Sequence, residues 1–405
     1  MKLNYPKSIP ENVVNNADSH GVYPARLELL DAYLQSMVDE GLHAFTGWSV
    51  YRRGKLIFSG EYGTQTPNGE PLLSDAIYPL QSETKPVLAT CAMILLEDGR
   101  LDLYDHLQKF FPEFVGENKD QVLLWHLLVH TSGIDDEAQW GFEQEILGNQ
   151  HPYDDAAYAA ARKKLGLTDA EITQAAKDEV HDIISLRAPL ASKPGTTYSY
   201  SSYCYELMKK IIERITGQTL EQFARERIFA PLGMDDTHWF LPVEKRDRFV
   251  IRDESFKGGP WINGEDMMTS DSASGGLKST LEDMAKFGLM FLGNGAYNGQ
   301  RILSRSAVRT MTQRDWNAKI PPSMWFGRLI ETSWGLGWDL KCSKVDDHGF
   351  TRSPRSYNHG GFGGACLLIE PDEDMVVSCY FCEQGQDSQN DDLGPAFNIL
   401  YSALD

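Results

Sequence analysis

The stretch ACLLIEPDEDMVVSCYFCE, residues 365–383, holds two apolar runs on either side of EPDED. Apolar and β-branched runs separated by proline and aspartate predict a β-hairpin. Residues 45–63, FTGWSVYRRGKLIFSGEYG, show a similar pattern near the N-terminus, with RRGK between two strand-like runs. The strand signals therefore come from both ends of the chain.

Helical patterns accompany these strands and dominate the middle of the chain. Residues 26–41 repeat apolar side chains at helical spacing and end in glycine, and residues 396–405 have the pattern of a short closing helix. Between them lie further helical patterns such as ELMKKIIERITG, LEQFARERIF and TLEDMAKFGLMFLGNG. We therefore expect an α+β fold, with an antiparallel sheet flanked by N- and C-terminal helices and built from residues 1–65 and 321–405. A mainly helical domain of residues 66–320 is inserted into it.

Composition and charge exclude several classes of function. The 405 residues are 41% hydrophobic and 24% charged, which is typical of a globular protein. A formal net charge of −20 repels phosphate backbones, so we expect no nucleic-acid partner. The chain contains no apolar run long enough to span a membrane and no signal-peptide pattern near Met1, so we expect a cytoplasmic protein.

Neither the cysteines nor the histidines form a recognisable metal motif. The six cysteines are scattered, and in CYFC the side chains of Cys379 and Cys382 would point to opposite faces of a strand. No second C-x-x-C is present to complete a zinc site. HLLVH places His126 and His130 one helical turn apart, but Leu127 stands where a metalloprotease needs glutamate. We expect neither a metal nor a cofactor.

QSETKP, residues 81–86, places Ser82 and Lys85 on one face of a helix that has proline in its first turn. A lysine next to a serine can act as its base, and the positive end of a helix dipole favours a developing alkoxide. S-x-x-K is also a frequent chance pattern. Taken alone, it is more typical of a serine at a helix start beside a solvated lysine.

Two further segments carry candidate groups. In PGTTYSYSSYCYELMKKIIERITG, Tyr200 lies in a loop just before a helix, where a phenol could transfer protons. In NHGGFGGACLLIE, His359 and two glycines open a strand whose backbone N–H groups could bind an oxyanion. Taken singly, the tyrosine could simply pack a loop and the histidine could simply belong to a turn.

The order of these motifs resembles the serine β-lactamase and penicillin-binding-protein superfamily, specifically its class C β-lactamase-like branch. That branch includes carboxylesterases, D,D-peptidases and D-amino-acid amidases. The similar stretches begin with YPLQSETKPVLATCAMILLEDGRLDLYDHLQKFFPEF, LLWHLLVHTSGI and the segment from KPGTTYSYSSYCYEL to DDTHW. They continue with SGGLKSTLEDMAKF, SWGLGWDL and NHGGFGGACLLIEPDEDMVVSCYF, so the resemblance runs from about residue 31 to the C-terminus.

The resemblance implies roles for three catalytic residues. Ser82 matches the acylated nucleophile, Lys85 its partner lysine and Tyr200 the tyrosine of the Y-x-N motif. Lys85 and Tyr200 would together take the Ser82 proton, and Tyr200 would pass it to the leaving group and later activate water. The active site would lie at the junction of the two domains.

Further positions follow or depart from the family pattern. Ser202 stands where asparagine is usual, and His359 stands where class C β-lactamases carry the lysine of K-T-G, followed by Gly360 and Gly361. The backbone N–H groups of Ser82 and Phe362 would form the oxyanion hole. We expect His359 to titrate near neutrality, which would weaken recognition of a substrate carboxylate.

The function implied is a serine acyl hydrolase, an esterase or amidase acting on a small acyl substrate. Two alternatives stay open: a β-lactamase or D,D-peptidase/D-aminopeptidase, and a non-catalytic ligand-binding sensor on the same fold. The interval 134–194 is long for the branch, and we expect it to help line the acyl pocket. The acyl group, the leaving group and the oligomeric state do not follow from the sequence.

Overall fold

The computed structural model describes residues 20–147, 164, 166, 177–256, 259–325, 328–345, 348–383 and 393–405. The chain divides into two compact units. The first unit comprises residues 1–97, 212–316 and 333–405, and the second comprises residues 98–211 and 317–332. Much of the 134–194 interval lies outside the described residues, so the role expected for it stays a prediction.

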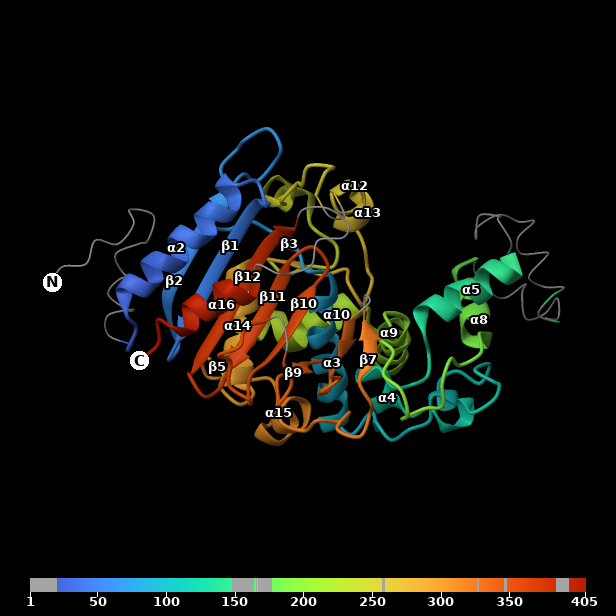
Figure 1. Ribbon diagram of the computed structural model, residues 1–405. Helices are drawn as coiled ribbons and strands as arrows, with labels where there is room; N and C mark the ends of the chain where they lie inside the picture. Colours follow the sequence, from blue (N-terminus) through green and yellow to red (C-terminus); the bar gives the residue numbers. More distant parts are fainter. Residues whose placement is uncertain are drawn as a thin grey trace. The chain divides into compact units, whose positions relative to one another are not determined.

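A six-stranded antiparallel sheet is the centre of the first unit (Figure 1). Its strand order is β2-β1-β12-β11-β10-β9, so the N-terminal hairpin pairs directly with the C-terminal strands. This confirms the predicted α+β fold with a sheet made from both ends of the chain. The strands are β1 His43–Arg52, β2 Lys55–Gly63, β9 Asp339–Leu340, β10 Tyr357–Gly361, β11 Ala365–Glu370 and β12 Met375–Glu383.

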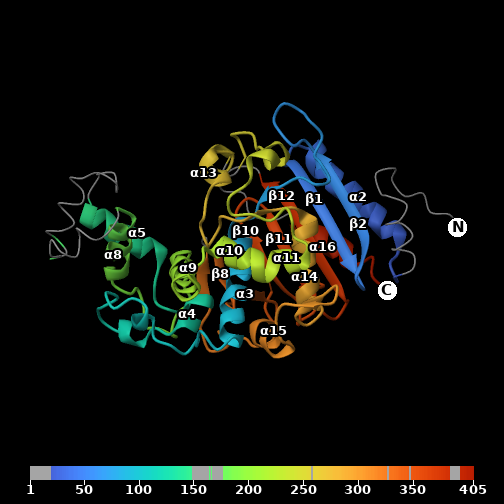
Figure 2. The same cartoon turned by 180° about the vertical axis from the view of Figure 1, so that it is seen from behind.

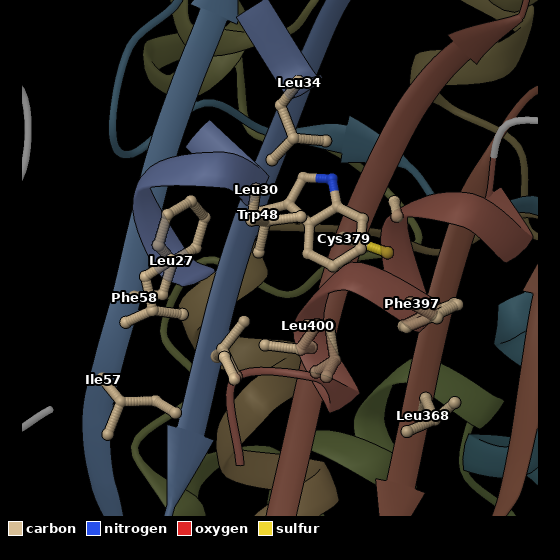
Figure 3. Close-up of a cluster of buried hydrophobic side chains, with 14 of the residues drawn as sticks. Leu27, Leu30, Leu34, Trp48, Ile57, Phe58, Leu368, Cys379, Phe397 and Leu400 are labelled. Carbon is tan, nitrogen blue, oxygen red and sulfur yellow. The ribbon is translucent and has the colours of Figure 1, made fainter. Parts of the chain in front are cut away.

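The terminal helices α2 (Pro24–Asp39) and α16 (Leu393–Tyr401) cover one face of this sheet. Their apolar side chains enclose Trp48, Leu368 and Cys379 in a buried core (Figure 3). Burying a leucine or phenylalanine side chain contributes roughly 1.5–3 kcal/mol, so this core accounts for the two terminal helices staying on the sheet.

Helix α14 (Leu281–Leu292) packs on the opposite face, the one seen from behind (Figure 2). A Cβ on Gly288 would lie 2.6 Å from a methyl of Val376 and 3.1 Å from one of Leu367. These two residues alternate along their strands with Val377 and Leu368, which face the terminal helices. The sheet is thus buried on both sides, which explains why β11 and β12 read as nearly continuous apolar runs.

The two units divide the chain differently from the predicted split into residues 1–65 with 321–405 and 66–320. Helix α3 (Thr84–Glu97) and helix α14 both come from the predicted insert, yet they contact the sheet strands within the first unit. Other elements of the first unit are the short strands β3 (Tyr78–Pro79) and β4 (Lys278–Ser279), and the helices α10 Leu220–Ala224, α12 Gly259–Ile262, α13 Glu265–Met268 and α15 Arg305–Thr312.

The second unit is mainly helical among its described residues. It contains α4 (Leu124–Leu128), α5 (Asp136–Leu147), α8 (Lys177–Arg187) and the start of α9 (Tyr203–Thr216). A small hairpin, β7 (Ser323–Trp325) with β8 (Arg328–Ile330), was not predicted. Within the ranges that the structure describes, no helix combines the length and hydropathy needed to cross a bilayer.

Candidate active site

Ser82 and Lys85 are joined by a hydrogen bond at the start of α3. Ser82 lies half-buried in a 3₁₀ turn, Gln81–Glu83, and Lys85 lies in the first helical turn with none of its surface exposed. Lys85 donates from Nζ to Ser82 Oγ at 3.0 Å and to the carbonyl of Ser274 at 2.9 Å. The alternative of a solvated lysine beside a capping serine is therefore wrong, because a lysine directed by two buried bonds is not in water.

The residue before the serine has an unusual backbone. Gln81 adopts φ 50°, a left-handed angle that residues other than glycine rarely take. Its side chain is buried and donates from Nε2 to the sulfur of Met267 in α13 at 3.2 Å. Strained residues of this kind cluster at functional sites, where the surrounding structure holds them in place.

Buried donors hold the loop before β4, which supplies the second acceptor of Lys85. Lys278 donates from Nζ to the carbonyl of Ser270 at 3.1 Å, and Trp239 donates from Nε1 to the carbonyl of Ser272 at 2.9 Å. Burial lowers the pKa of Lys278 to about 7. These bonds fix the loop from which the Ser274 carbonyl directs Lys85, and the sequence pattern SGGLKST did not predict them.

His359 lies in β10, close enough to Lys85 for the two charges to interact. Burial, followed by the positive charge of Lys85, lowers the pKa of His359 to about 3, so the expectation that it titrates near neutrality is wrong. Its Nδ1 lies 2.8 Å from the carbonyl of Gly360, which can only accept, so Nδ1 carries the proton of the neutral ring. The edge of the ring meets Trp334 of the SWGLGWDL stretch, with centroids 5.7 Å apart.

The end of β10 approaches the segment that precedes Ser82. A Cβ on Gly361 would lie 2.0 Å from the carbonyl oxygen of Leu80, so only glycine permits this approach. At Gly360 the nearest atom would be 3.6 Å away, an ordinary contact. The second glycine of NHGG, Gly361, is thus required for steric reasons. Strand β10 ends beside the turn that holds Ser82.

Two neighbouring side chains, Arg252 and Trp261, restrain the turn that follows β10. A Cβ on Gly363 would collide with the guanidinium of Arg252, which is buried and lies 5.2 Å from the ring centroid of Tyr380. Phe362 stacks on Trp261 of α12 with centroids 5.7 Å apart. These contacts fix the backbone of Phe362, whose N–H the resemblance assigns to the oxyanion hole.

Tyr200 and Ser202 belong to the second unit and are described within it. The Tyr200 ring stacks on the buried ring of His130, with centroids 4.3 Å apart. His130 also accepts the backbone N–H of Ser201 at Nδ1 (3.1 Å), and its own carbonyl accepts that of Ser199. His130 is therefore part of the support for the tyrosine loop rather than a metal ligand.

Asp136, at the start of α5, fixes the other side of this loop. Its carboxylate accepts the Ser201 hydroxyl at 2.6 Å and the Ser202 backbone N–H at 2.7 Å, at the N-terminus of α9. The Ser202 backbone is thus held by a half-buried carboxylate. Asp136 was not among the predicted site residues, and its only signal in the sequence is an acidic residue soon after the HTSG stretch.

No metal site is predicted from the sequence. Among the residues that the structure describes, no group of histidine, cysteine and carboxylate side chains is arranged to hold a metal ion. His126 uses Nδ1 to accept the backbone N–H of Leu123 at 3.0 Å, so neither histidine of HLLVH has the orientation of a paired ligand.

An antiparallel sheet built from both chain ends, with the buried start of a helix carrying serine and lysine beside it, defines a β-lactamase-like serine hydrolase fold. The chain belongs to the beta-lactamase family, whose family model matches residues 30–395. The chain therefore also belongs to the superfamily of serine β-lactamases and penicillin-binding proteins, which are hydrolases.

Individual proteins resemble this chain along most of its length. Protein Rv1367c of Mycobacterium tuberculosis is 27% identical over 382 residues, which is 85% of this chain and 87% of that protein. A penicillin-binding protein homologue from Caulobacter crescentus superposes with a TM-score of 0.72 at 19% identity, covering 95% of this chain and 99% of that one. EstCE1, a hydrolase with promiscuous acyltransferase activity, superposes with a TM-score of 0.68 at 18% identity and covers 94% of this chain and 98% of its own. At these identities the two structures support the fold alone.

Proposed function

We propose that the protein hydrolyses esters or amides of a small acyl group through a covalent acyl-enzyme on Ser82. The observation that carries this proposal is the 3.0 Å bond between Lys85 Nζ and Ser82 Oγ, made by a lysine with no exposed surface. A nucleophile in hydrogen-bond reach of its base, with the base oriented by a third group, is the arrangement that covalent catalysis requires. Here the third group is the Ser274 carbonyl.

The reaction would proceed in two steps. Lys85, in its uncharged form, accepts the Ser82 proton as Ser82 Oγ attacks the substrate carbonyl, and the leaving group departs with that proton. Water then attacks the acyl-enzyme and restores Ser82. On the family resemblance, Tyr200 is the second proton-transfer group, and the N–H groups of Ser82 and Phe362 stabilise the oxyanion. The approach of Gly361 to Leu80 supports the oxyanion assignment, because it holds the end of β10 beside the 3₁₀ turn of Ser82.

Neutral substrates fit this site better than anionic ones. His359 is uncharged at neutral pH, where a class C β-lactamase has a lysine for the substrate carboxylate. Ser202 lacks the carboxamide that would hold a peptide-like side chain. We therefore favour an esterase or amidase over a β-lactamase or D,D-peptidase, which stays the second candidate because the fold is shared with a penicillin-binding protein homologue.

A chromogenic panel tests the proposal. It contains p-nitrophenyl esters of increasing chain length, D-alanyl p-nitroanilide and nitrocefin, and each compound is assayed with wild type, Ser82→Ala and Ser402→Ala. Ser402 is an exposed serine after α16, so its variant should behave as wild type. We expect ester or amide turnover that Ser82→Ala abolishes. Nitrocefin turnover above that of every ester would favour the second candidate. Binding of a panel compound to wild type and to Ser82→Ala, with turnover in neither, would favour a sensor.

The expected setting of this activity also stays a proposal. We propose a cytoplasmic enzyme whose partner is a small acyl substrate, with no nucleic-acid or membrane partner. The negative formal charge of −20 supports the absence of nucleic-acid binding. Fractionation of cells that express the full-length gene would test the location.

A further inference from the structure

Cys366 and Cys379 lie directly opposite each other on the adjacent antiparallel strands β11 and β12. Opposed residues of such strands have Cα atoms about 4.5–5.5 Å apart, within the roughly 4.4–6.8 Å that a disulfide spans. Both side chains are 1% exposed and belong to the core under α2 and α16, where Cys379 lies beside Trp48 (Figure 3). The pair is reduced in this structure, and the strands already have the register that a cross-strand disulfide needs.

The two thiols are not chemically equivalent. The sulfur of Cys366 accepts hydrogen bonds from the Cys379 thiol and from His348, and these bonds lower the pKa of Cys366 to about 6. Burial and the neighbouring Cys366 raise the pKa of Cys379 well above its ordinary value. These hydrogen bonds favour the thiolate form of Cys366, the form that attacks oxidants, and leave Cys379 as the thiol that can resolve the product.

The residue across from Cys366 on the β10 side carries no side chain. This residue is Gly360. A Cβ placed there would meet only the carbonyl of Ala365, at 3.6 Å. A methyl group would therefore fit at this position across from Cys366 without displacing a neighbour.

Charged groups connect the pair with the nucleophile. His348 bonds to Cys366 and also contributes to the lowered pKa of His359, whose other charged neighbour is Lys85. Glu83 follows Ser82 directly, is buried, and has a pKa raised well above its ordinary value by burial and by Cys366. A change of charge at Cys366 would therefore act on Glu83, the residue that follows Ser82.

Arg352 is a further charge that faces Cys366 and helps to keep it ionised. The groups that face the thiol pair are therefore His348 and Arg352 from the loop between β9 and β10, and Glu83 from the 3₁₀ turn. All of them belong to the first unit.

We propose that Cys366 and Cys379 are an oxidative modification site, at which a peroxide closes a cross-strand disulfide between β11 and β12, next to the 3₁₀ turn that holds Ser82. The Cys366 thiolate attacks the peroxide, its O–O bond breaks, and a sulfenic acid forms while hydroxide or an alkoxide leaves. The Cys379 sulfur then attacks the sulfenic sulfur, its proton leaves with the departing oxygen as water, and the S–S bond forms. Two thiols are oxidised and one peroxide is reduced.

The chemical arm of the test needs no activity. Wild type is treated with hydrogen peroxide, remaining thiols are alkylated, and non-reducing peptide maps are compared with reduced ones. We expect a single linked peptide joining residues 366 and 379, absent from Cys379→Ser and retained in Cys382→Ser. Cys382 is a matched control because it lies on the same strand but in the core on the other face. Peroxide that oxidises other cysteines without forming this link in wild type overturns the proposal.

The second arm rests on the proposed function and measures fluorophosphonate labelling of Ser82 against pH. Loss of the Cys366 thiolate charge would lower the pKa of nearby groups. Oxidation should therefore move the acid limb of the labelling–pH profile to lower pH by about one unit. Cys366→Ser should show the shifted limb already in the reduced state and no response to peroxide, and dithiothreitol should restore the wild-type profile. An unchanged profile in linked protein overturns the charge coupling. Failure of reduced protein to label overturns the proposed function and leaves the chemical arm standing.

Discussion

Replacing Gly361 by alanine tests whether the close approach of β10 to Leu80 positions the catalytic turn. The added Cβ would lie 2.0 Å from the Leu80 carbonyl oxygen, whereas ordinary contact begins at 3.4 Å, so about 1.4 Å must be created between the two segments. The atom in the way belongs to the backbone, and no side-chain rotation relieves the overlap. Leu80 is itself held by a 2.9 Å bond from its N–H to the Leu277 carbonyl, so β10 is the segment that has to move.

Both stability and acylation should respond. Overpacking of this kind costs about 1–3 kcal/mol of unfolding free energy. A misplacement of about 1 Å at a catalytic group costs about 100-fold in rate, so Ser82 acylation should fall by that factor. The matched variant is Gly360→Ala, whose Cβ meets nothing closer than 3.6 Å and which should leave both quantities near wild type.

The assay is the second-order rate of fluorophosphonate labelling, measured beside a thermal melt of each protein. The melt separates a folded but slow variant from an unfolded one. Labelling of Gly361→Ala within twofold of Gly360→Ala, in two proteins that melt alike, would show that the approach to Leu80 has no part in positioning the site.

Other changes have equally direct outcomes. Lys85→Met should reduce fluorophosphonate labelling by roughly 10²–10⁴-fold, the usual contribution of a general base, while the melt shows a folded protein; labelling at the wild-type rate would exclude Lys85 as the base. The pKa of His359 is about 3 in the folded protein and ordinary when unfolded, so the unfolded chain binds more protons between those values and stability falls as pH drops below about 6.5. Urea denaturation should therefore show wild type losing roughly 1.4 kcal/mol per pH unit there from this residue, a loss absent from His359→Gln; equal slopes would contradict the neutral histidine. Asp136→Ala should lower the unfolding free energy by about 1–2 kcal/mol in the same assay, because the start of α9 loses its acceptor, whereas Glu137→Ala one residue on should not.

The elements that have strong local patterns were predictable from sequence. The hairpins β1–β2 and β11–β12 and the helices α2, α14 and α16 follow from alternating or helical apolar periodicity, because each of these elements buries an apolar face. The short strands β3 and β4 were not predictable, since a two-residue strand carries no periodicity and exists because distant segments pair. The packing of α3 and α14 with the sheet, rather than with a separate domain, is likewise a property of tertiary contacts.

The candidate site was also only partly predictable from the sequence. Ser82, Lys85, Tyr200 and His359 could be proposed from motif order, because their types and spacing are visible in the chain. Their electrostatic states could not, since a pKa depends on neighbours that only folding brings together. The neutral state of His359 is set by burial and by Lys85, which stands far from it in sequence.

The neutral state of His359 also changes what the site can recognise. A lysine at this position offers donors and a positive charge to a substrate carboxylate. His359 uses its Nδ1 proton on the Gly360 carbonyl, so the remaining ring nitrogen, Nε2, is an acceptor. A neutral histidine in place of the lysine removes a positive charge from this position, and under the proposed function this would favour uncharged acyl substrates over penicillin-like or D-alanyl ones.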